Sequence, residues 1–306
     1  MEAAKEDGKL RGKTVVITGA SSGFGRGAAL AFAEAGAAVA LAARRGELLE
    51  EIADECRAAG VEALALQTDV SEPTDVAVLA EMAVAQLGPI DVWINNAGVG
   101  AIGPFERVPL EDHAQVIATN LLGTLYGSYF AYRHFLEKGS GILINVASEL
   151  GRYSVPYFAS YAAAKHGVVG LGEALRQELD QNGIEAVHVC TVLPTAHDTP
   201  FFDHVANYSG HEVQAPEPLH DPQNVVDTLV RLARDPKDQE IVGADGVVKV
   251  LLKKLAPGVA EKFGARSVHK RQIEQAPPAP DSPGAVRQPS RVGTRVSAGR
   301  ARGARD

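Results

Sequence analysis

The chain has 306 residues, of which 45% are hydrophobic and 22% charged, the composition of an ordinary globular protein. A chain of this length can bury a sizeable core without disulfides. Its net charge is −8, but the stretch 275–306 carries six Arg and two Asp, a surplus of +4, so the preceding body carries −12. Such an acidic body argues against a nucleic-acid-binding domain.

The two cysteines, Cys56 and Cys190, lack metal-ligand spacing, and the sequence predicts neither a disulfide nor a metal site. We interpret them as buried or incidental thiols of a reducing compartment. The first residues, MEAAKEDGKLRGK, lack the apolar segment of a secretory signal, and no run of about eighteen apolar residues occurs in the chain. These features predict a cytoplasmic protein that does not span a membrane.

Short apolar runs alternate with helical patterns along the first two thirds of the chain. The runs are rich in Val, Ile, Leu and Ala, as expected of strands that are covered on both faces. The predicted strands are 13–18, 37–43, 61–67, 90–96, 141–147 and 184–193. Helical patterns at 25–36, 47–60 and 74–88 each end on a glycine, a common helix stop. This alternation predicts an α/β fold with a doubly wound parallel sheet, Rossmann-like, in a single domain.

After Pro194 the pattern loosens. We expect a mobile segment over a site at 195–220, a helix at 221–236 with Asp221 at its N-cap and Pro222 at its first position, and a last strand at 240–243. Residues 247–275 read as one or two amphipathic helices, and the tail is too poor in apolar residues to fold. The predicted organisation is an N-terminal arm (1–12), a Rossmann-like domain (13–243), a C-terminal helical extension (244–275) and a disordered basic tail (276–306).

A glycine-rich turn, TGASSGFG, directly follows the first predicted strand and opens the first helix. Gly19, Gly23 and Gly25 would permit a tight turn, close approach of the backbone to a phosphate, and close packing of the helix. The free N–H groups at the helix N-terminus would then face a pyrophosphate. A glycine-rich turn without a ligand is the alternative, but the position in the first βαβ unit favours dinucleotide binding.

The second strand ends in LAARR, and this end concerns the choice of cofactor. Folds specific for NAD place an acidic residue here, whereas this chain has Ala43 followed by Arg44 and Arg45. A guanidinium binds a 2′-phosphate through two parallel hydrogen bonds. Solvated arginines are the alternative, but a helix start is unfavourable for idle cations. The sequence therefore predicts NADP(H), with NAD(H) less favoured.

Tyr161 and Lys165 lie four positions apart in a helical pattern, which places them on one helix face. With seven Tyr and eleven Lys in the chain, chance produces such a pair in about one chain in four, so the pair alone carries little weight. In combination with a cofactor site it suggests chemistry. An adjacent ammonium is expected to lower the pKa of the phenol from about 10, which suits proton exchange with a carbonyl oxygen.

The combined motifs resemble the short-chain dehydrogenase/reductase family, in its compact single-domain branch, from about Thr14 to Thr199. They are Thr18–Gly25, Asp69, Asn95–Gly98, Asn120, Ser148, Tyr161 with Lys165, and Pro194 with Thr199. The resemblance implies that Tyr161 is the acid/base, that Ser148 hydrogen-bonds the substrate oxygen, and that Lys165 also binds the nicotinamide ribose. Asn120 would anchor a water relay to Lys165. The implied cofactor-binding residues are Gly19, Ser21, Ser22, Gly23, Phe24, Gly25, Arg44, Arg45, Asp69, Val70, Asn96, Ala97, Gly98, Tyr161, Lys165, Pro194 and Thr199.

Three positions depart from the family pattern. Ala164 stands where a Ser usually precedes the lysine, Thr195 where a Gly usually follows Pro194, and His197 where a Val is usual. These departures affect the closure of the nicotinamide loop and leave the reaction class unchanged. His197, His204 and His211 are expected to be surface histidines, since their spacing and loop context do not suit a metal site.

The resemblance implies an oxidoreductase that interconverts a carbonyl and a secondary alcohol. The alternatives are a non-catalytic dinucleotide sensor or scaffold, and an epimerase or dehydratase of the extended branch, whose glycine spacing and large C-terminal domain are absent here. The aromatic residues near the site favour a lipophilic small-molecule substrate, although several could merely pack a lid. They are Tyr153, Tyr157, Phe158, Phe201, Phe202 and Tyr208.

The helical extension has an apolar stripe beside Lys249, Lys253 and Lys254. One interpretation of this pattern is contact with an anionic membrane surface. We favour a stripe that covers the domain's own core or a partner in a homo-oligomer, because helices usually bury their apolar face within protein.

Overall fold

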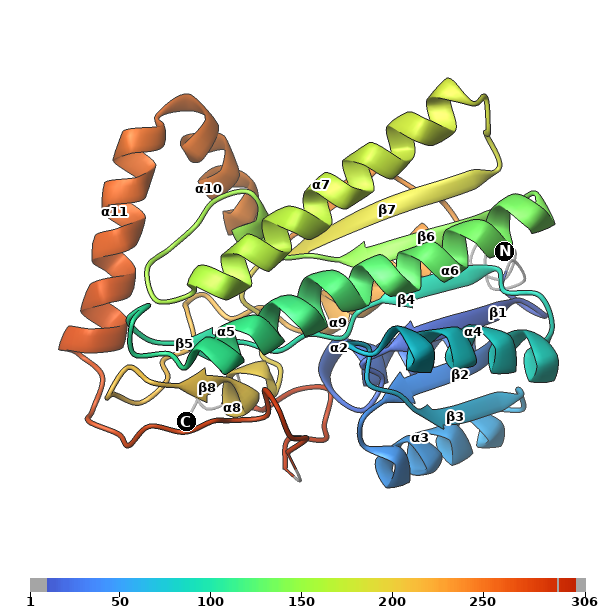
Figure 1. Cartoon of the computed structure of the whole chain (residues 1–306), viewed down its shortest axis with the longest axis horizontal. Coiled ribbons are helices and arrows are strands. Elements are labelled where there is room, and N and C mark those ends of the chain that lie inside the picture. The colour runs from blue at the N-terminus through green and yellow to red at the C-terminus, as the bar shows by residue number, and fades with distance from the viewer. Residues whose placement is uncertain (1–9, 291, 301–306) are drawn as a thin grey trace.

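The computed structural model describes residues 10–290 and 292–300, and in this part of the chain seven strands form one parallel sheet (Figure 1). The strand order is β3-β2-β1-β4-β6-β7-β9, and every neighbouring pair is parallel. The strands are β1 (Thr14–Thr18), β2 (Ala38–Ala43), β3 (Ala63–Gln67), β4 (Val92–Asn95), β6 (Gly141–Val146), β7 (Val187–Pro194) and β9 (Gln239–Val242). The doubly wound sheet predicted from the sequence is confirmed.

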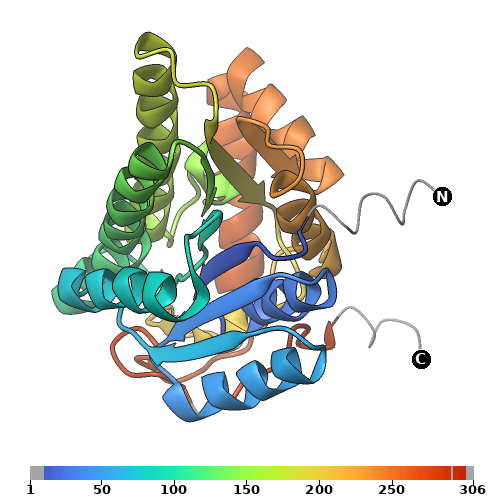
Figure 2. The same cartoon turned by 90° about the vertical axis from the view of Figure 1, so that its right-hand side faces the viewer.

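Helices cover both faces of the sheet because the strands present apolar side chains on both sides. One face packs against α2 (Gly23–Glu34), α3 (Gly46–Ala58) and α9 (Gln223–Leu232). The other packs against α4 (Pro73–Leu87), α6 (Gly123–Lys138) and α7 (Ala159–Gln181). Figure 2 shows the two layers on opposite sides of the sheet. The remaining helical elements before the extension are α5 (Leu110–Ile117), η1 (Ala118–Leu122), η2 (Glu149–Gly151) and α8 (Phe201–His204).

Local sequence signals account for several element ends. The helices α2, α3 and α4 stop just before Gly36, Gly60 and Gly88, all of which have a positive φ that a side chain would disfavour. The start of α9 differs by one residue from the prediction, because Pro222 is the N-cap. The carboxylate of Asp221 still accepts the N–H of Gln223 at 2.9 Å, which is the capping bond its residue type suggests.

The strand order determines where a ligand site of this fold lies. β1 lies between β2 and β4, and the chain leaves it toward β2 on one side and later returns to β4 on the other. Ligands of open parallel sheets bind at such a switch point, outside the carboxyl ends of the strands. The glycine-rich turn after β1 and the segment after β4 both lie at this edge.

The segment 195–220 is more ordered than its polar, proline-broken sequence predicts. It contains α8 and the short strand β8 (Ala206–Asn207), which pairs with β5 (Ala101–Ile102). Val205 and Tyr208 are buried, and Tyr208 belongs to a satellite apolar cluster. The first half of this segment is therefore a packed part of the fold, and it differs in this from the mobile segment expected from the sequence.

The extension folds into α10 (Ala244–Leu255), α11 (Pro257–His269) and the short η3 (Lys270–Glu274). In Figure 1 the two helices form a hairpin at one end of the molecule, and α10 lies against β9. In the single chain its apolar stripe does not cover the domain's own core, because large apolar side chains of the hairpin are exposed, and cover by a partner in a homo-oligomer stays a prediction. The exposed side chains are Val247, Val248, Leu251, Leu252, Leu255, Val259 and Phe263. None of the helices in the described part of the chain has the length and apolarity needed to cross a membrane.

The two ends of the chain also differ from the predicted organisation. Leu10, assigned to an N-terminal arm, is buried in the main core, while residues 1–9 lie outside the described residues. The prediction of a disordered tail is wrong for 276–290 and 292–300, which lie against the domain, with Ala285 and Val286 buried. The physical reason is that the tail builds no core of its own but docks on an existing one. Residues 301–306 of that prediction lie outside the described residues.

Candidate active site

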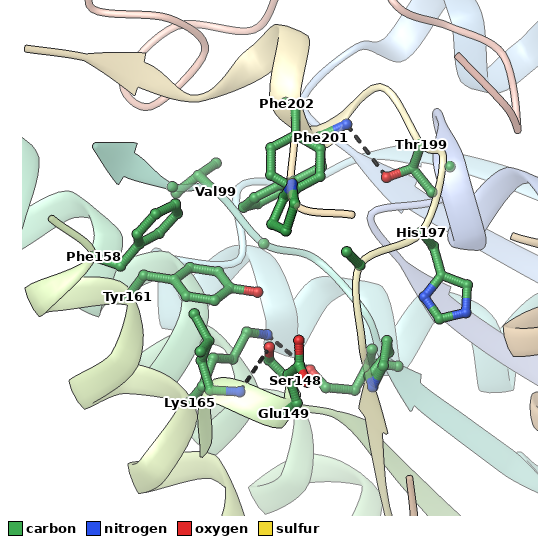
Figure 3. Close-up of a pocket in the computed structure, with 18 of the residues that line it drawn as sticks. Val99, Ser148, Glu149, Phe158, Tyr161, Lys165, His197, Thr199, Phe201 and Phe202 are labelled. Carbon is green, nitrogen blue, oxygen red and sulfur yellow. Dashed lines mark hydrogen bonds between the residues drawn. The ribbon is translucent and has the colours of Figure 1, made fainter. Parts of the chain in front are cut away.

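Three of the four predicted catalytic side chains meet at the end of β6. Tyr161 and Lys165 come from the first turns of α7, and Ser148 lies two residues past the end of β6, at the N-cap of η2 (Figure 3). The Nζ atom of Lys165 lies 5.7 Å from the centroid of the Tyr161 ring and donates to the carbonyl oxygen of Val146 at 2.8 Å. The lysine is thus tied to the strand that carries Ser148, which fixes the geometry of the trio.

Burial sets the protonation of this trio. Burial raises the pKa of Tyr161 to about 12, although a hydrogen bond with Ser148 acts in the opposite direction. Burial also lowers the pKa of Lys165 to about 8. The expected lowering of the phenol pKa below its usual value is therefore not seen, because desolvation dominates and the ammonium is not among the groups that shift this pKa. At neutral pH Tyr161 is a neutral phenol beside a cationic lysine, and it can donate a proton.

Asn120 lies behind the wall of the site. It sits in the π-helical turn η1, between α5 and α6, and is fully buried. Its Oδ1 accepts the N–H of Val99 and its Nδ2 donates to the carbonyl of Val99, both at 2.8 Å. The side chain is therefore engaged in fixing the segment after β4. The water relay from Asn120 to Lys165 stays a prediction.

The glycine-rich turn has the shape of a phosphate cradle. Gly19 and Gly23 have positive φ angles, and a Cβ atom on Gly25 would lie 2.2 Å from the carbonyl oxygen of Gly19. Asn96 closes the turn from β4, since its Nδ2 donates to the carbonyl of Thr18 at 3.0 Å. The turn directs the N-terminus of α2 toward the cleft, so the residues present fit a pyrophosphate.

The two predicted phosphate-binding arginines lie at one end of the same cleft. Arg45 donates from Nε and Nη2 to the hydroxyl of Ser21, at 3.1 and 2.9 Å, which holds it against the glycine-rich turn. Arg44 lines the cleft beside Asp69, whose carboxylate accepts the hydroxyl of Ser71 at 2.7 Å. Two guanidinium groups at the end of β2 fit an additional phosphate group on the ribose.

A cavity of about 470 Å³ joins the cofactor residues to the catalytic trio. Of the predicted cofactor-binding residues, only Gly25 does not line it, because Gly25 packs against the turn. Those that line it are Gly19, Ser21, Ser22, Gly23, Phe24, Arg44, Arg45, Asp69, Val70, Asn96, Ala97, Gly98, Tyr161, Lys165, Pro194 and Thr199. The cavity also extends past the catalytic trio toward α10 and α11. Its apolar lining there comprises Val155, Phe158, Phe201, Phe202, Leu252, Phe263 and Val268.

The nicotinamide loop accommodates its unusual residues by local packing. Thr195 donates from its hydroxyl to the carbonyl of Val242 at 3.1 Å, and a Cβ atom on Gly243 would lie 2.0 Å from that hydroxyl. His197 is only 2% exposed and packs edge-on against Phe24, with ring centroids 5.4 Å apart. The expectation of a surface histidine is therefore wrong for His197. Among the described residues, no three His, Cys, Asp or Glu side chains are grouped to hold a metal ion.

An ion-pair cluster beside Ser148 was not predicted from the sequence. Glu149 lines the cavity and lies 3.3 Å from Nζ of Lys249, which in turn lies 2.7 Å from the carboxylate of Asp245. Burial raises the pKa of Glu149, while Lys249 opposes the rise. The position of Glu149 next to Ser148 could have indicated that it lies near the site. Its pairing with Lys249 could not be predicted, because no sequence pattern relates it to a lysine 100 positions later on α10.

Comparisons with known proteins agree with this geometry. A family model described as short chain dehydrogenase matches residues 13–208, and the chain belongs to this family of oxidoreductases. It is 32% identical over 274 residues to the uncharacterized oxidoreductase YxnA of Bacillus subtilis, covering 89% of this chain and 77% of the relative.

Two solved structures share the fold. One is a short-chain dehydrogenase/reductase from Burkholderia phymatum in complex with NAD, with a TM-score of 0.73 and 27% identity, over 83% of this chain and 96% of that chain. The other is an alcohol dehydrogenase from the archaeon Thermococcus sibiricus complexed with 5-hydroxy-NADP, with a TM-score of 0.65 and 27% identity, over 75% and 95%. Both neighbours hold a nicotinamide dinucleotide, and they differ in the 2′-phosphate.

Proposed function

We propose that the protein is an NADP(H)-dependent oxidoreductase that interconverts a carbonyl and a secondary alcohol. The observation that carries this proposal is the placement of Tyr161, Ser148 and Lys165 at the wall of a cavity that continues into the phosphate cradle. Fold alone would not support an activity, but a proton donor next to a dinucleotide cleft does.

Tyr161, Ser148 and Lys165 each have a separate role in this reaction. When bound, the nicotinamide would supply or accept the hydride. Tyr161 donates its phenolic proton to the carbonyl oxygen in reduction and takes it back in oxidation. Ser148 donates a hydrogen bond to the same oxygen and so stabilises the negative charge that develops there. The Lys165 cation, 5.7 Å from the Tyr161 ring centroid, stabilises the phenolate left after proton transfer.

The preference for NADP(H) rests on Arg44 and Arg45. Both line the cleft at the end of β2, where Ala43 leaves no carboxylate to accept ribose hydroxyls. A 2′-phosphate would form charge-assisted bonds with these guanidiniums, whereas two neutral hydroxyls would gain little from them. The structural neighbour that is complexed with 5-hydroxy-NADP favours a preference for NADP(H), and the neighbour that holds NAD favours NAD(H).

A lipophilic substrate fits the apolar half of the cavity. Phe201 packs on Tyr161 with ring centroids 5.5 Å apart, and on Phe202 at 5.4 Å. The ring of Phe158 also lies near Tyr161, with the centroids 6.4 Å apart. In Figure 3 these rings lie along one side of the phenol, so the substrate carbon skeleton would lie against aromatic faces. We therefore propose a steroid-like, retinoid-like or fatty carbonyl compound.

We also propose a homo-oligomer in the cytoplasm, as the family resemblance suggests. Cys56 and Cys190 are buried free thiols whose pKa burial raises to about 11, so neither is a reactive or bridging cysteine. Light scattering on the purified chain tests the assembly, and a mass equal to one chain would contradict it.

A panel of carbonyl compounds with NADPH and NADH tests the function. We expect NADPH consumption with lipophilic ketones or aldehydes, and weaker activity with small polar carbonyls. Nucleotide binding without turnover of any member of the panel would favour a non-catalytic dinucleotide sensor. Turnover confined to small polar carbonyls would contradict the proposed substrate class while leaving the reaction class in place.

A further inference from the structure

The tail crosses the cofactor cleft instead of leaving the domain. Figure 1 shows the tail running from α11 past β8 and α8 toward the half of the molecule that contains α2 and β2. Its course is fixed by backbone pairing with the segment after β7: the N–H groups of Asn207 and Ser282 donate to each other's carbonyls at 2.7 and 2.8 Å. The N–H of Ala285 donates to the carbonyl of His204 at 2.7 Å, and Val286 is fully buried in the satellite cluster.

Beyond this anchor, tail carbonyls bind the arginines proposed for the 2′-phosphate. Nη2 of Arg44 donates to the carbonyl of Ala285 at 2.6 Å, and its Nη1 donates to the carbonyls of Val286 and Arg287 at 3.0 and 3.2 Å. Nη1 of Arg45 donates to the carbonyl of Ser290 at 3.3 Å. The terminal nitrogens of Arg44 are thus already used by backbone oxygens.

The same segment then covers the phosphate cradle. The N–H of Gly23, at the N-terminus of α2, donates to the carbonyl of Arg295 at 2.9 Å. One turn further along α2, Nη1 of Arg26 donates to the carbonyl of Thr294 at 3.0 Å. A backbone oxygen therefore lies where a pyrophosphate oxygen is expected to accept its hydrogen bond.

The last described residues reach the nicotinamide loop. The hydroxyl of Ser297 donates to the carboxylate of Asp198 at 2.9 Å, and Nη1 of Arg300 donates to the carbonyl of Thr199 at 3.0 Å. Tail contacts therefore follow the whole cofactor track, from the 2′-phosphate end, over the pyrophosphate cradle, to the loop that faces the nicotinamide.

We propose that residues 285–290 and 292–300 are an internal ligand of the nucleotide cleft, which NADP(H) must displace in order to bind. The proposal rests on the proposed function for the identity of the nucleotide. The Gly23 N–H and the terminal nitrogens of Arg44 cannot donate in full to a carbonyl and a phosphate at once, so the two occupants exclude each other. Phosphate oxygens are anionic and carbonyls are neutral, so the nucleotide makes the stronger bonds and displaces the tail when it is abundant.

Competition of this kind lowers the apparent affinity for the cofactor. The apparent dissociation constant equals the intrinsic constant divided by the fraction of molecules whose tail is released. If about one molecule in ten has a released tail, full release strengthens binding about tenfold. Besides Arg44, the tail occupies the Gly23 N–H, which would bind the pyrophosphate that NADPH and NADH share. Release of the tail therefore strengthens the binding of both nucleotides.

The test uses the full-length chain with a variant whose tail is loosened. Val286→Ser with Val296→Ser removes the buried anchor and a contact against Gly27 of α2. Val292→Ser is the matched control, because that side chain lies in the same segment and is 66% exposed. Trypsin cleavage after the tail arginines, followed by mass spectrometry, reports the docking of the tail without any nucleotide. We expect rapid cleavage in the double variant and slow cleavage in the control and the unmodified chain.

Nucleotide binding completes the test. NADPH should accelerate tail cleavage in the unmodified chain, and the double variant should bind NADPH about tenfold more tightly than the control. Protection of the tail by NADPH, or equal affinities in the double variant and the control, would overturn the competition and leave the proposed function intact. Failure of the double variant to bind any nicotinamide dinucleotide would overturn the proposed function, and this inference with it.

Discussion

Replacing Arg44 by alanine should remove the preference for NADPH over NADH. Arg44 is one of two guanidiniums at the end of β2, and it is held in the cleft beside Asp69. A 2′-phosphate would accept two parallel hydrogen bonds from its planar fork, whereas the methyl group of an alanine offers none. Arg45 remains in the variant, since its Nε and Nη2 are bound to Ser21.

The magnitude follows from the strength of one charge-assisted contact. Hydrogen bonds to charged groups contribute about 1.5–3 kcal/mol, which corresponds to a loss of roughly ten- to a hundredfold in affinity. Arg44 also donates to three tail carbonyls, so its removal loosens the tail. Loosening favours both nucleotides by the same factor and cancels in their ratio. The absolute affinity for NADH should therefore stay equal or increase, while the NADPH/NADH affinity ratio falls.

Fluorescence titration with both nucleotides measures this ratio. Arg57→Ala is the control, because Arg57 lies on α3 outside the cavity, where it is paired with Glu50 and Asp54. We expect the ratio of the control to match that of the unmodified chain. Equal affinities for NADPH and NADH in the unmodified chain, or an unchanged ratio in Arg44→Ala, would refute the reasoning.

Two further predictions concern the cradle and the catalytic trio. Gly25→Ala should abolish nucleotide binding and lower the melting temperature, because its Cβ atom would lie 2.2 Å from the carbonyl oxygen of Gly19. Gly170→Ala is the control and should bind nucleotide normally, because a Cβ atom there would have no atom within 4 Å. Equal binding by both variants would contradict the assignment of the glycine-rich turn as the phosphate site. The kcat/KM for carbonyl reduction should be level at neutral pH and should fall as the pH rises through about 8, because Lys165 loses its proton there. Tyr161, with a pKa of about 12, stays protonated over this range. A profile that stays level to about pH 10 would contradict the role given to the lysine cation.

Strands buried on both faces could be predicted from the sequence, while paired segments of two residues could not. Each long strand is a near-continuous apolar run, which requires cover on both sides. The pair β5 and β8 has two residues on each side and therefore no periodicity to detect. The segment 195–220 was for this reason expected to be more loosely packed than it is.

The tail shows a limit of composition arguments. A segment rich in Pro, Gly, Ser and Arg cannot bury enough apolar surface to form its own core, and this part of the argument holds. Docking requires much less, because a few buried side chains such as Val286, and hydrogen bonds from Arg44 and Arg45 to backbone carbonyls of the tail, suffice to hold it. Backbone carbonyls carry no sequence signal, so the contact between tail and cleft could not be predicted.

Within the site, residue positions were predictable and electrostatics were not. Ser148, Tyr161 and Lys165 occur in order at family spacing, and the structure brings them together at the end of β6. Spacing does not reveal that the lysine donates to the Val146 carbonyl, or that burial dominates the pKa of the phenol. It also does not reveal that Asn120 uses its side chain on the backbone of Val99.

Tyr161→Phe tests the central claim most directly, with Tyr157→Phe as the matched control. Tyr157 precedes the same helix and bonds His269 at 2.6 Å, and it does not line the cavity. Single-turnover consumption of NADPH with a carbonyl substrate should fall by about a hundredfold to ten thousandfold in Tyr161→Phe, since one positioned acid contributes this much. NADPH affinity should stay nearly unchanged, and the control should react normally. Undiminished consumption in Tyr161→Phe would contradict the assignment of Tyr161 as the proton donor.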